Sequence, residues 1–295
     1  MTKKQFDVLD MLACCEKKLS QRAVAAGLGL SIGTVNRTMS ELTEAGLIAD
    51  GAVTETGLAA LEPYRVRRAV FVAAGFGSRL VPITLNTPKP LVRVKGKRII
   101  DTLLDAVYAA GIEEVYIVRG YLGEQFDQLL YQYPDLHFIE NPLYNESNNI
   151  SSVLCAGDRF ENAYILEADL LLYNPALIRK YQYCSNYLGV PVKKTDDWCF
   201  KTNSKGVITR FGLGGEDCYH MFGISYWDAE DGRRLAGHVR QAFEAPGGKE
   251  RYWDQVPLEY FADQYEVHVR PCTFDDLTEI DTFNELKRLD KTYDI

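Results

Sequence analysis

The sequence lacks long hydrophobic runs, paired-cysteine motifs and any excess of positive charge. No apolar segment approaches the roughly 18 residues that a membrane-spanning helix needs, so we expect no membrane association. The seven cysteines include no Cys-x-x-Cys pair. Their odd number, without a signal peptide, favours reduced thiols and a cytoplasmic location. A net charge of −8 argues against a surface that binds polyanions in general.

What remains is the composition of an ordinary folded protein. Of the 295 residues, 46% are hydrophobic and 25% are charged, which is enough to bury a sizeable core. This length accommodates one α/β domain and a small additional domain.

A glycine-rich loop is the most informative segment. The apolar run Val70–Val72 predicts a buried strand. It leads into Ala73-Ala74-Gly75-Phe76-Gly77-Ser78-Arg79-Leu80, and Lys89 follows after a proline. Glycine lets the backbone approach an anion closely, and successive N–H groups can surround phosphate oxygens. We therefore predict a nucleotide triphosphate site. The candidate nucleotide-binding residues are Ala73, Ala74, Gly75, Gly77 and Ser78.

Two common phosphate motifs are excluded. No Gly-Lys-Ser/Thr closes the loop, and Leu80 stands where the dinucleotide fingerprint requires a third glycine. The longer pattern Ala-Ala-Gly-x-Gly-Ser-Arg-Leu-x-Pro-x-Thr, followed by Pro-Lys-Pro-Leu, resembles the nucleotidyltransferases that make NDP-sugars and CDP-alcohols. The resemblance implies that the loop wraps the NTP phosphates. It also implies that Arg79 and Lys89 stabilise charge as pyrophosphate leaves.

Residues 1–65 read as a separate domain. Helical periodicity and caps predict helices over residues 3–17, 20–26 and 32–45, with Ser20 and Ser31 as N-caps. A turn is expected over residues 27–30 and a small hairpin over residues 47–54. Three helices and a hairpin describe a winged helix-turn-helix, and the segment resembles its MarR-like version.

DNA is a candidate partner of this domain. The expected recognition helix offers a single cation, Arg37, and residues 1–65 carry seven Lys/Arg against eight Asp/Glu. Phosphate contacts dominate affinity for DNA, and this domain has few to give. The sequence leaves open whether it binds DNA or serves as a packing or dimerisation module.

Residues 66–295 alternate strands and helices, which predicts a doubly wound, mostly parallel α/β sheet. Strands are expected over residues 114–118, 136–139 and 163–166, and helices over residues 99–110, 123–131, 151–158 and 255–262. Ligands of such sheets bind beyond the carboxyl ends of the strands. The glycine loop, the amide-rich loop containing Asn148 and Asn149, and Asp169 should all lie at that edge.

Two aspartates are candidate ligands of Mg²⁺, which prefers oxygen ligands. Asp169 follows a predicted strand, and Asp254 follows a Tyr-Trp pair. Either could instead be a helix cap or a turn residue. Asp281 competes with Asp254, but the next residues, Thr282 to Glu285, fit a helix capping box, which makes a structural role economical there. We therefore choose Asp169 and Asp254.

Aromatic residues gather in the last third of the chain, which contains all three tryptophans. Tyr226 and Trp227 could be core residues. Asp197-Trp198 and Tyr252-Trp253-Asp254, however, combine rings with acids in positions typical of loops. Aromatic faces beside carboxylates suit a quaternary ammonium, which carries diffuse charge and donates no hydrogen bond.

Taken in order, these motifs resemble bacterial CTP:phosphocholine cytidylyltransferases of the LicC type, over residues 67–290. The resemblance implies that Asp169 and Asp254 hold Mg²⁺ and that Trp198, Tyr252 and Trp253 enclose choline. It implies transfer of CMP from CTP to phosphocholine. We place Asn148 and Asn149 near the pyrimidine. Lys193 is a candidate contact for the incoming phosphate, although a solvated surface lysine explains it at least as well.

Two alternatives stay open. Phosphoethanolamine or 2-aminoethylphosphonate could replace phosphocholine as acceptor, because Asp196 or Asp197 could accept hydrogen bonds from a primary ammonium. A transcriptional regulator that only senses ligand would be expected to lose the metal carboxylates or Lys89, and all are present.

Overall fold

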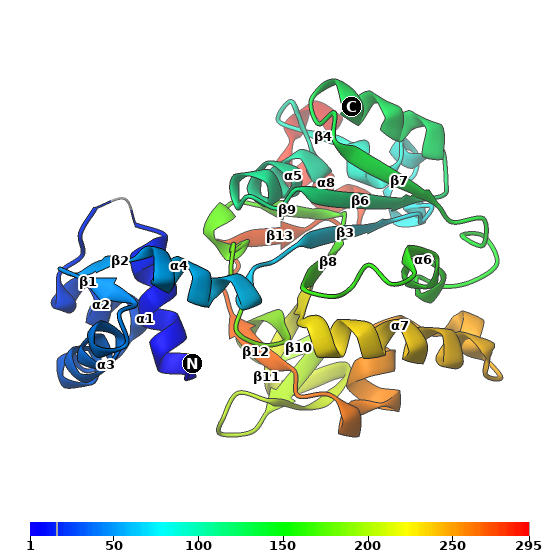
Figure 1. Cartoon of the computed structure of the whole chain (residues 1–295). Helices are drawn as coiled ribbons and strands as arrows, with labels where there is room; N and C mark the ends of the chain where they lie inside the picture. The colour runs from blue at the N-terminus through cyan, green and yellow to red at the C-terminus, as the bar shows by residue number, and fades with distance from the viewer. Residues whose placement is uncertain (16, 295) are drawn as a thin grey trace. The chain divides into compact units, whose positions relative to one another are not determined.

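The computed structural model describes residues 1–15 and 17–294, and these form two compact units. The first unit comprises Met1–Arg65 together with Tyr181–Tyr183, and the second comprises the remaining described residues. Figure 1 labels the elements of both units.

The first unit is a winged helical domain, as predicted. Its elements are α1 (Lys3–Ala13), α2 (Gln21–Leu28), α3 (Ile32–Glu44), β1 (Ile48–Ala49), β2 (Ala52–Val53), α4 (Glu55–Leu61) and η1 (Glu62–Tyr64). The side chains of Ser20 and Ser31 cap α2 and α3, which confirms both predicted N-caps. The predicted turn over residues 27–30 is partly wrong, because α2 continues to Leu28 and ends at Gly29 in the left-handed conformation.

The core of this unit includes a segment from far along the sequence. Tyr181 is 4% exposed and belongs to the same hydrophobic cluster as the buried side chains of α1 and α3. The ring of Tyr183 stacks on Tyr64 with their centroids 5.5 Å apart, and it also contacts Phe6. Local sequence patterns cannot reveal such a contribution, because it depends on tertiary packing.

The second unit is built on a seven-stranded sheet whose strand order is β12-β10-β11-β8-β3-β6-β7. Its strands are β3 (Arg68–Ala73), β6 (Glu114–Arg119), β7 (Leu136–Glu140), β8 (Ala163–Glu167), β10 (Asn186–Thr202), β11 (Ile208–Trp227) and β12 (His268–Pro271). The pairs formed by β3, β6, β7 and β8 are parallel, whereas β11 is antiparallel to both of its neighbours. This confirms the predicted mostly parallel α/β fold.

Smaller elements complete the second unit. The short strands are β4 (Arg93–Val94), β5 (Lys97–Arg98), β9 (Leu170–Leu172) and β13 (Leu277–Glu279). The α-helices are α5 (Ile99–Ala109), α6 (Ile150–Ala156), α7 (Ala229–Glu244) and α8 (Phe283–Leu289). Residues 123–131, predicted as a helix, form the 3₁₀ segment η5, and the helix predicted over residues 255–262 is a π-helical turn, η8 (Val256–Tyr260), followed by a 3₁₀ turn.

The sheet separates two hydrophobic layers. Along β3, Phe71 packs with α5 on one face, and Val70 packs with α6 and α7 on the other. This alternation follows from the strand geometry, because successive side chains point to opposite faces. Each layer is a cluster of buried side chains, and α6 and α7 lie on the same side of the sheet in Figure 1.

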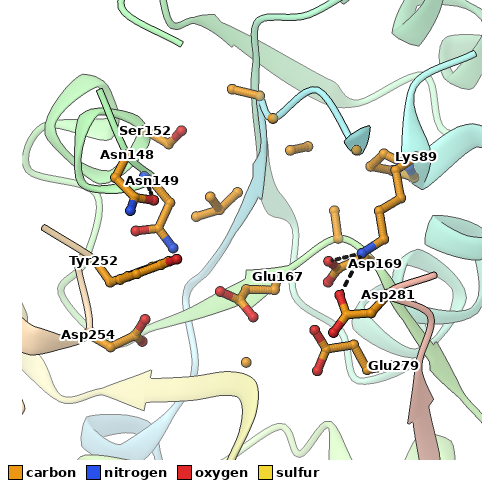
Figure 2. A pocket seen from close by; sticks show the side chains of 18 of the residues that line it. Lys89, Asn148, Asn149, Ser152, Glu167, Asp169, Tyr252, Asp254, Glu279 and Asp281 are labelled. Carbon is orange, nitrogen blue, oxygen red and sulfur yellow. Dashed lines mark hydrogen bonds and ion pairs between the residues drawn. The ribbon is translucent and has the colours of Figure 1, made fainter. Parts of the chain in front are cut away.

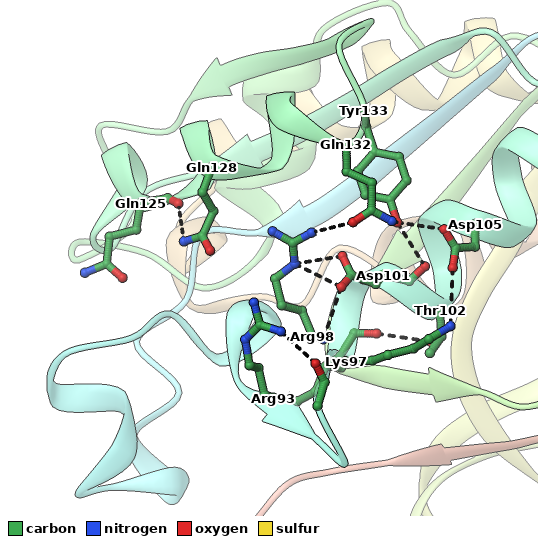
Figure 3. Close-up of polar contacts among 12 residues, drawn as sticks. Arg93, Lys97, Arg98, Asp101, Thr102, Asp105, Gln125, Gln128, Gln132 and Tyr133 are labelled. Atoms are coloured by element: carbon green, nitrogen blue, oxygen red, sulfur yellow. Dashed lines mark hydrogen bonds and ion pairs between the residues drawn. The ribbon is translucent and has the colours of Figure 1, made fainter.

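A buried polar network fixes the start of α5 (Figure 3). The guanidinium of Arg98 donates to the Asp101 carboxylate at 2.8 Å, and both side chains are nearly inaccessible to solvent. Arg98 also donates to Gln132, and Tyr133 donates to Asp105. Because a buried charge is costly unless paired, this network ties the two residues that follow η5 to the start of α5.

All cysteines within the described residues are free thiols. Among the helices that the structure describes, none combines the length and the apolar character needed to cross a bilayer.

Candidate active site

A cavity of about 620 Å³ opens at the carboxyl ends of β3 and β8. The glycine loop, the amide loop, the β10–β11 pair and the segments around Tyr252 and Glu279 all contribute to its wall (Figure 2). Most of the site residues predicted from sequence line it, namely Ala73, Ala74, Gly75, Gly77, Ser78, Arg79, Lys89, Asn148, Asn149, Asp169, Trp198, Tyr252 and Asp254. Their individual roles stay predictions.

The glycine loop is held by local contacts. Gly77 has φ +61°, a conformation that strongly favours glycine. A Cβ at this position would lie 3.0 Å from side-chain carbons of both Lys89 and Thr84. The Thr84 hydroxyl donates to the Gly77 carbonyl at 2.9 Å, which fixes the turn. Gly77 thus sets the position of both the loop backbone and the Lys89 side chain.

Gly77→Ala should raise the KM for the nucleotide by about 10-fold or more, because the new methyl group displaces Lys89 and strains the loop. Steady-state kinetics with varied CTP would measure the change. Gly96→Ala is the matched control, because Gly96 also has positive φ but its Cβ would meet no atom within 4 Å. Equal effects of the two substitutions on KM would contradict the positional role of Gly77.

Lys89 joins two acidic segments. Its ammonium donates to Asp169 at 2.7 Å and to Asp281 at 3.2 Å, and Arg79 donates to the same Asp281 carboxylate at 2.6 Å. Burial by itself would lower the pKa of Lys89, but the neighbouring carboxylates, Asp169 first, raise it above its ordinary value. Lys89 is therefore a permanently charged group positioned where an anionic ligand could exchange with Asp281.

A carboxylate cluster surrounds this cation. One ligand oxygen from each of Glu167, Asp169 and Glu279 lies within 4.8 Å of the others. Burial, followed by the charges of the neighbouring acids, raises the pKa of Glu167 and of Glu279 well above their usual range. Sequence analysis missed both glutamates, although Glu167-Ala168-Asp169 and Glu279-Ile280-Asp281 share one spacing that brings alternate side chains to the same face of an extended segment.

Asp281 is not used to cap α8. The capping box predicted at this corner is confirmed, but it consists of the reciprocal contacts between Thr282 and Glu285. The Asp281 carboxylate instead faces Lys89 and Arg79 in the cavity. The structural argument that favoured Asp254 over Asp281 as a metal ligand therefore does not hold.

Asp254 lies at the opposite side of the cavity from Lys89, beside Tyr252 (Figure 2). It is 3% exposed, and the Tyr187 hydroxyl donates to its carboxylate. Burial raises the pKa of Asp254 to about 6, although the hydrogen bond from Tyr187 opposes part of that rise. Tyr187, which the sequence did not single out, thus fixes the orientation of this carboxylate.

The raised pKa of Asp254 predicts a pH-dependent stability. Because the folded-state pKa exceeds the ordinary 3.8, the folded protein binds this proton more tightly than the unfolded chain. The resulting stabilisation is present below the unfolded pKa and is lost as pH rises through about 6. Asp254→Asn in metal-free protein should therefore gain free energy of unfolding relative to wild type between about pH 5 and about pH 7. Urea unfolding at both pH values measures this difference, and a constant difference would contradict the assignment.

Two aromatic rings stand at the Asp254 side of the cavity. Tyr252 is 42% exposed and meets Trp198 edge to face at 5.6 Å. One face of Trp198 is already covered by Phe211, whose ring is stacked at 4.8 Å. The two rings give this end an apolar wall but only a partial aromatic enclosure.

Two predicted contacts need correction. Trp253 is 1% exposed and packs in the core against Tyr187 and Trp227, so it does not line the cavity. Burial also confirms the core interpretation of Trp227. Lys193 is almost fully exposed and pairs with Asp217 at 2.7 Å, outside the cavity lining.

The amide loop is anchored to the segment that contains Tyr252. Asn149 accepts a hydrogen bond from the Trp253 amide at 2.9 Å through its side-chain oxygen. The Asn148 amide donates to the Lys249 carbonyl at 2.7 Å. These contacts hold both asparagines at the rim of the cavity. This location is compatible with the predicted position of their side chains near a nucleotide base.

Comparison with known proteins agrees with this arrangement. The MobA-like NTP transferase domain model matches residues 69–192, and a winged helix-turn-helix DNA-binding model matches residues 1–49. A 2-aminoethylphosphonate cytidylyltransferase from Lancefieldella rimae is 37% identical over 228 residues, covering 76% of this chain and 92% of that relative. A choline-phosphate cytidylyltransferase from Haemophilus influenzae is 30% identical, covering 74% and 93% of the two chains.

Among solved structures, the CTP:phosphocholine cytidylyltransferase from Streptococcus pneumoniae aligns with a TM-score of 0.71 at 27% identity, covering 77% of this chain and 99% of that one. The chain therefore belongs to the cytidylyltransferase family of nucleotidyltransferases, and it carries an N-terminal winged helix-turn-helix. It is a CTP-dependent enzyme that acts on a small molecule carrying a phosphate or phosphonate group.

Proposed function

We propose that the enzyme transfers CMP from CTP to 2-aminoethylphosphonate and releases pyrophosphate. This acceptor replaces phosphocholine, the main sequence-based prediction, with one of its alternatives. The observation that carries the proposal is the similarity to the Lancefieldella rimae enzyme over nearly its whole length. The acid-rich lining of the cavity supports it further.

The reaction needs positioning and charge neutralisation more than proton transfer. A phosphonate oxygen forms a bond to the α-phosphorus of CTP, while the bond from that phosphorus to the bridging oxygen of pyrophosphate breaks. The nucleophile is already an anion, so no general base is required. Lys89 and Arg79 would leave Asp281 and stabilise the charge on the departing pyrophosphate. The glycine loop would orient the phosphates.

The residues present fit a magnesium ion. The donors around Asp169 are all carboxylate oxygens, which suit a hard cation. Asp169 Oδ1 is buried and has no hydrogen-bond partner among the described residues. Asp169 and Glu279, with Asp281 on the same side of the cavity, would hold the ion, in place of the predicted pair of Asp169 and Asp254; Glu167 is the third member of this carboxylate cluster. Bound there, magnesium would neutralise phosphate oxygens during transfer.

The balance of acids and rings favours a primary ammonium on the acceptor. Such a group donates three hydrogen bonds and is best served by carboxylates, whereas a quaternary ammonium relies on aromatic faces. Asp254 offers a buried carboxylate and Glu167 a half-buried one, while Phe211 occupies one face of Trp198. The site therefore matches an aminoalkyl phosphonate better than phosphocholine.

A coupled pyrophosphate assay tests the proposal. CTP would be supplied with 2-aminoethylphosphonate, phosphoethanolamine or phosphocholine in turn, and each acceptor would also be tried with ATP, GTP and UTP. We expect the highest kcat/KM for CTP with 2-aminoethylphosphonate. A higher kcat/KM with phosphocholine would contradict the proposed acceptor without contradicting cytidylyl transfer.

The winged helix-turn-helix supports a second function, DNA binding, because its family model is a DNA-binding one. The exposed face of α3 carries the cation Arg37, paired only loosely with Glu41 at 3.8 Å. An electrophoretic shift with the upstream DNA of its own coding sequence at physiological salt would support this role. Binding only at low salt would indicate a non-specific electrostatic interaction.

A further inference from the structure

Glu167 is a half-buried carboxylate with no counter-ion among the described residues. It ends β8, and its side chain makes no hydrogen bond or ion pair with any residue that the structure describes. Figure 2 shows it in the middle of the cavity, between Asp254 on one side and Asp169 with Glu279 on the other. The nearest cation, Lys89, donates instead to Asp169 and Asp281.

The neighbouring strand leaves space for this carboxylate. Gly223 lies on β11, next to the pairing of Ile224 with Leu166 on β8. A Cβ at Gly223 would overlap the Glu167 carboxyl group. Gly223 also lines the cavity. The fold therefore accommodates Glu167 in one place, facing the ligand space.

Holding an unpaired, half-buried carboxylate next to other acids is unfavourable, so its natural partner is a cation from outside the chain. Of the three clustered carboxylates, Asp169 and Glu279 would hold a metal ion together with the nearby Asp281, which would leave Glu167 for a second cation. The other cation available to this reaction is the ammonium of the acceptor. In 2-aminoethylphosphonate two carbon atoms separate nitrogen from phosphorus, so the ammonium must lie close to the phosphonate and hence to the acids that would hold the metal ion beside it. Glu167 meets that condition, because its oxygen is within 4.8 Å of Asp169.

We propose that Glu167 is the specificity-determining counter-ion of a primary ammonium group on the acceptor, with Asp254 as its neighbour. This inference rests on the proposed function and names the residue that selects the amine. Asp197, considered from the sequence for the same role, is exposed, and its carboxylate accepts from the Trp198 amide at 2.7 Å. Water screens an exposed charge, so it discriminates poorly between ligands.

The test compares two acceptors of similar shape, 2-aminoethylphosphonate and n-propylphosphonate, which has a methyl group in place of the ammonium. In Glu167→Gln the kcat/KM for 2-aminoethylphosphonate should fall about 10- to 100-fold, through KM, while that for n-propylphosphonate stays unchanged or rises. The ratio of kcat/KM for 2-aminoethylphosphonate to that for n-propylphosphonate should therefore fall in this variant. Asp197→Asn is the matched control and should retain the wild-type ratio.

Three outcomes decide the question. Selective loss of the amine substrate supports the inference. An equal loss on both acceptors, or a raised Mg²⁺ requirement, overturns it and assigns Glu167 to the metal, while the proposed function stands. A wild-type enzyme that uses both acceptors equally contradicts the inference, because no residue then selects the amine, while CMP transfer to 2-aminoethylphosphonate still stands. Gly223→Ala is a second variant, in case Glu167→Gln does not fold. It displaces the Glu167 carboxylate without removing its charge. It should also lower the ratio of kcat/KM for 2-aminoethylphosphonate to that for n-propylphosphonate.

Discussion

Asp169→Asn should lower kcat for CMP transfer by at least roughly 10³-fold, with the fold intact. The substitution keeps the size of the side chain but removes the charge that would bind magnesium beside the triphosphate. Asp169 Oδ1 has no hydrogen-bond partner within the described chain, so its replacement breaks only the contact with Lys89. Pyrophosphate release from CTP, with saturating acceptor and magnesium, measures the effect.

Asp158→Asn is the matched control for this prediction, because Asp158 is exposed and does not line the cavity. It should leave kcat unchanged within about 2-fold. Measuring kcat as a function of magnesium concentration distinguishes weaker metal binding from a slower transfer step. If Asp169→Asn retained wild-type turnover at ordinary magnesium concentrations, Asp169 would have no role in holding the ion.

Lys89→Met should lower kcat/KM for CTP by about 10³-fold and should also destabilise the metal-free enzyme. The activity falls because the cation opposite the departing pyrophosphate is lost. The stability falls because Asp169 and Asp281 keep their charges but lose the ammonium that both contact. Removing one partner of a buried pair costs about 3 kcal/mol, and the partial exposure of Asp169 reduces this to about 2 kcal/mol.

Urea unfolding measures the stability change, and CTP kinetics well below the unfolding temperature measure the activity change. Lys193→Met is the control, because its ammonium pairs with Asp217 on the exposed surface. It should alter neither quantity appreciably. Stability that is unchanged in Lys89→Met would show that Asp169 and Asp281 do not depend on this cation.

Local signals were sufficient for most of the fold. The caps at Ser20 and Ser31 and the apolar run Val70–Val72 depend on neighbouring residues, and each element lies where they indicate. The addition of Tyr181–Tyr183 to the first unit depends on packing between distant segments, which no local pattern reports. The long β10–β11 pair was also missed, because its solvent-exposed stretches carry no simple alternation.

The site was predictable where a motif marks a backbone shape. The glycine loop and Lys89 converge on the cavity because their spacing encodes a particular turn. The roles of the acidic site residues were harder to predict, because any aspartate near the start of a helix can be interpreted as a cap. Asp281 shows this, because the capping group is its neighbour Thr282. Trp253 was misplaced for a related reason, because a ring beside a functional residue can be core.

The enzyme is proposed to bind CTP and an aminoalkyl phosphonate in one cavity and to transfer CMP between them. Phosphorus NMR of wild-type enzyme with CTP, magnesium and 2-aminoethylphosphonate tests this proposal most directly. We predict two new mutually coupled signals, one from a phosphonate and one from the CMP phosphorus, growing in step with pyrophosphate. An unchanged phosphonate signal, in enzyme that turns over phosphocholine under the same conditions, would contradict the account.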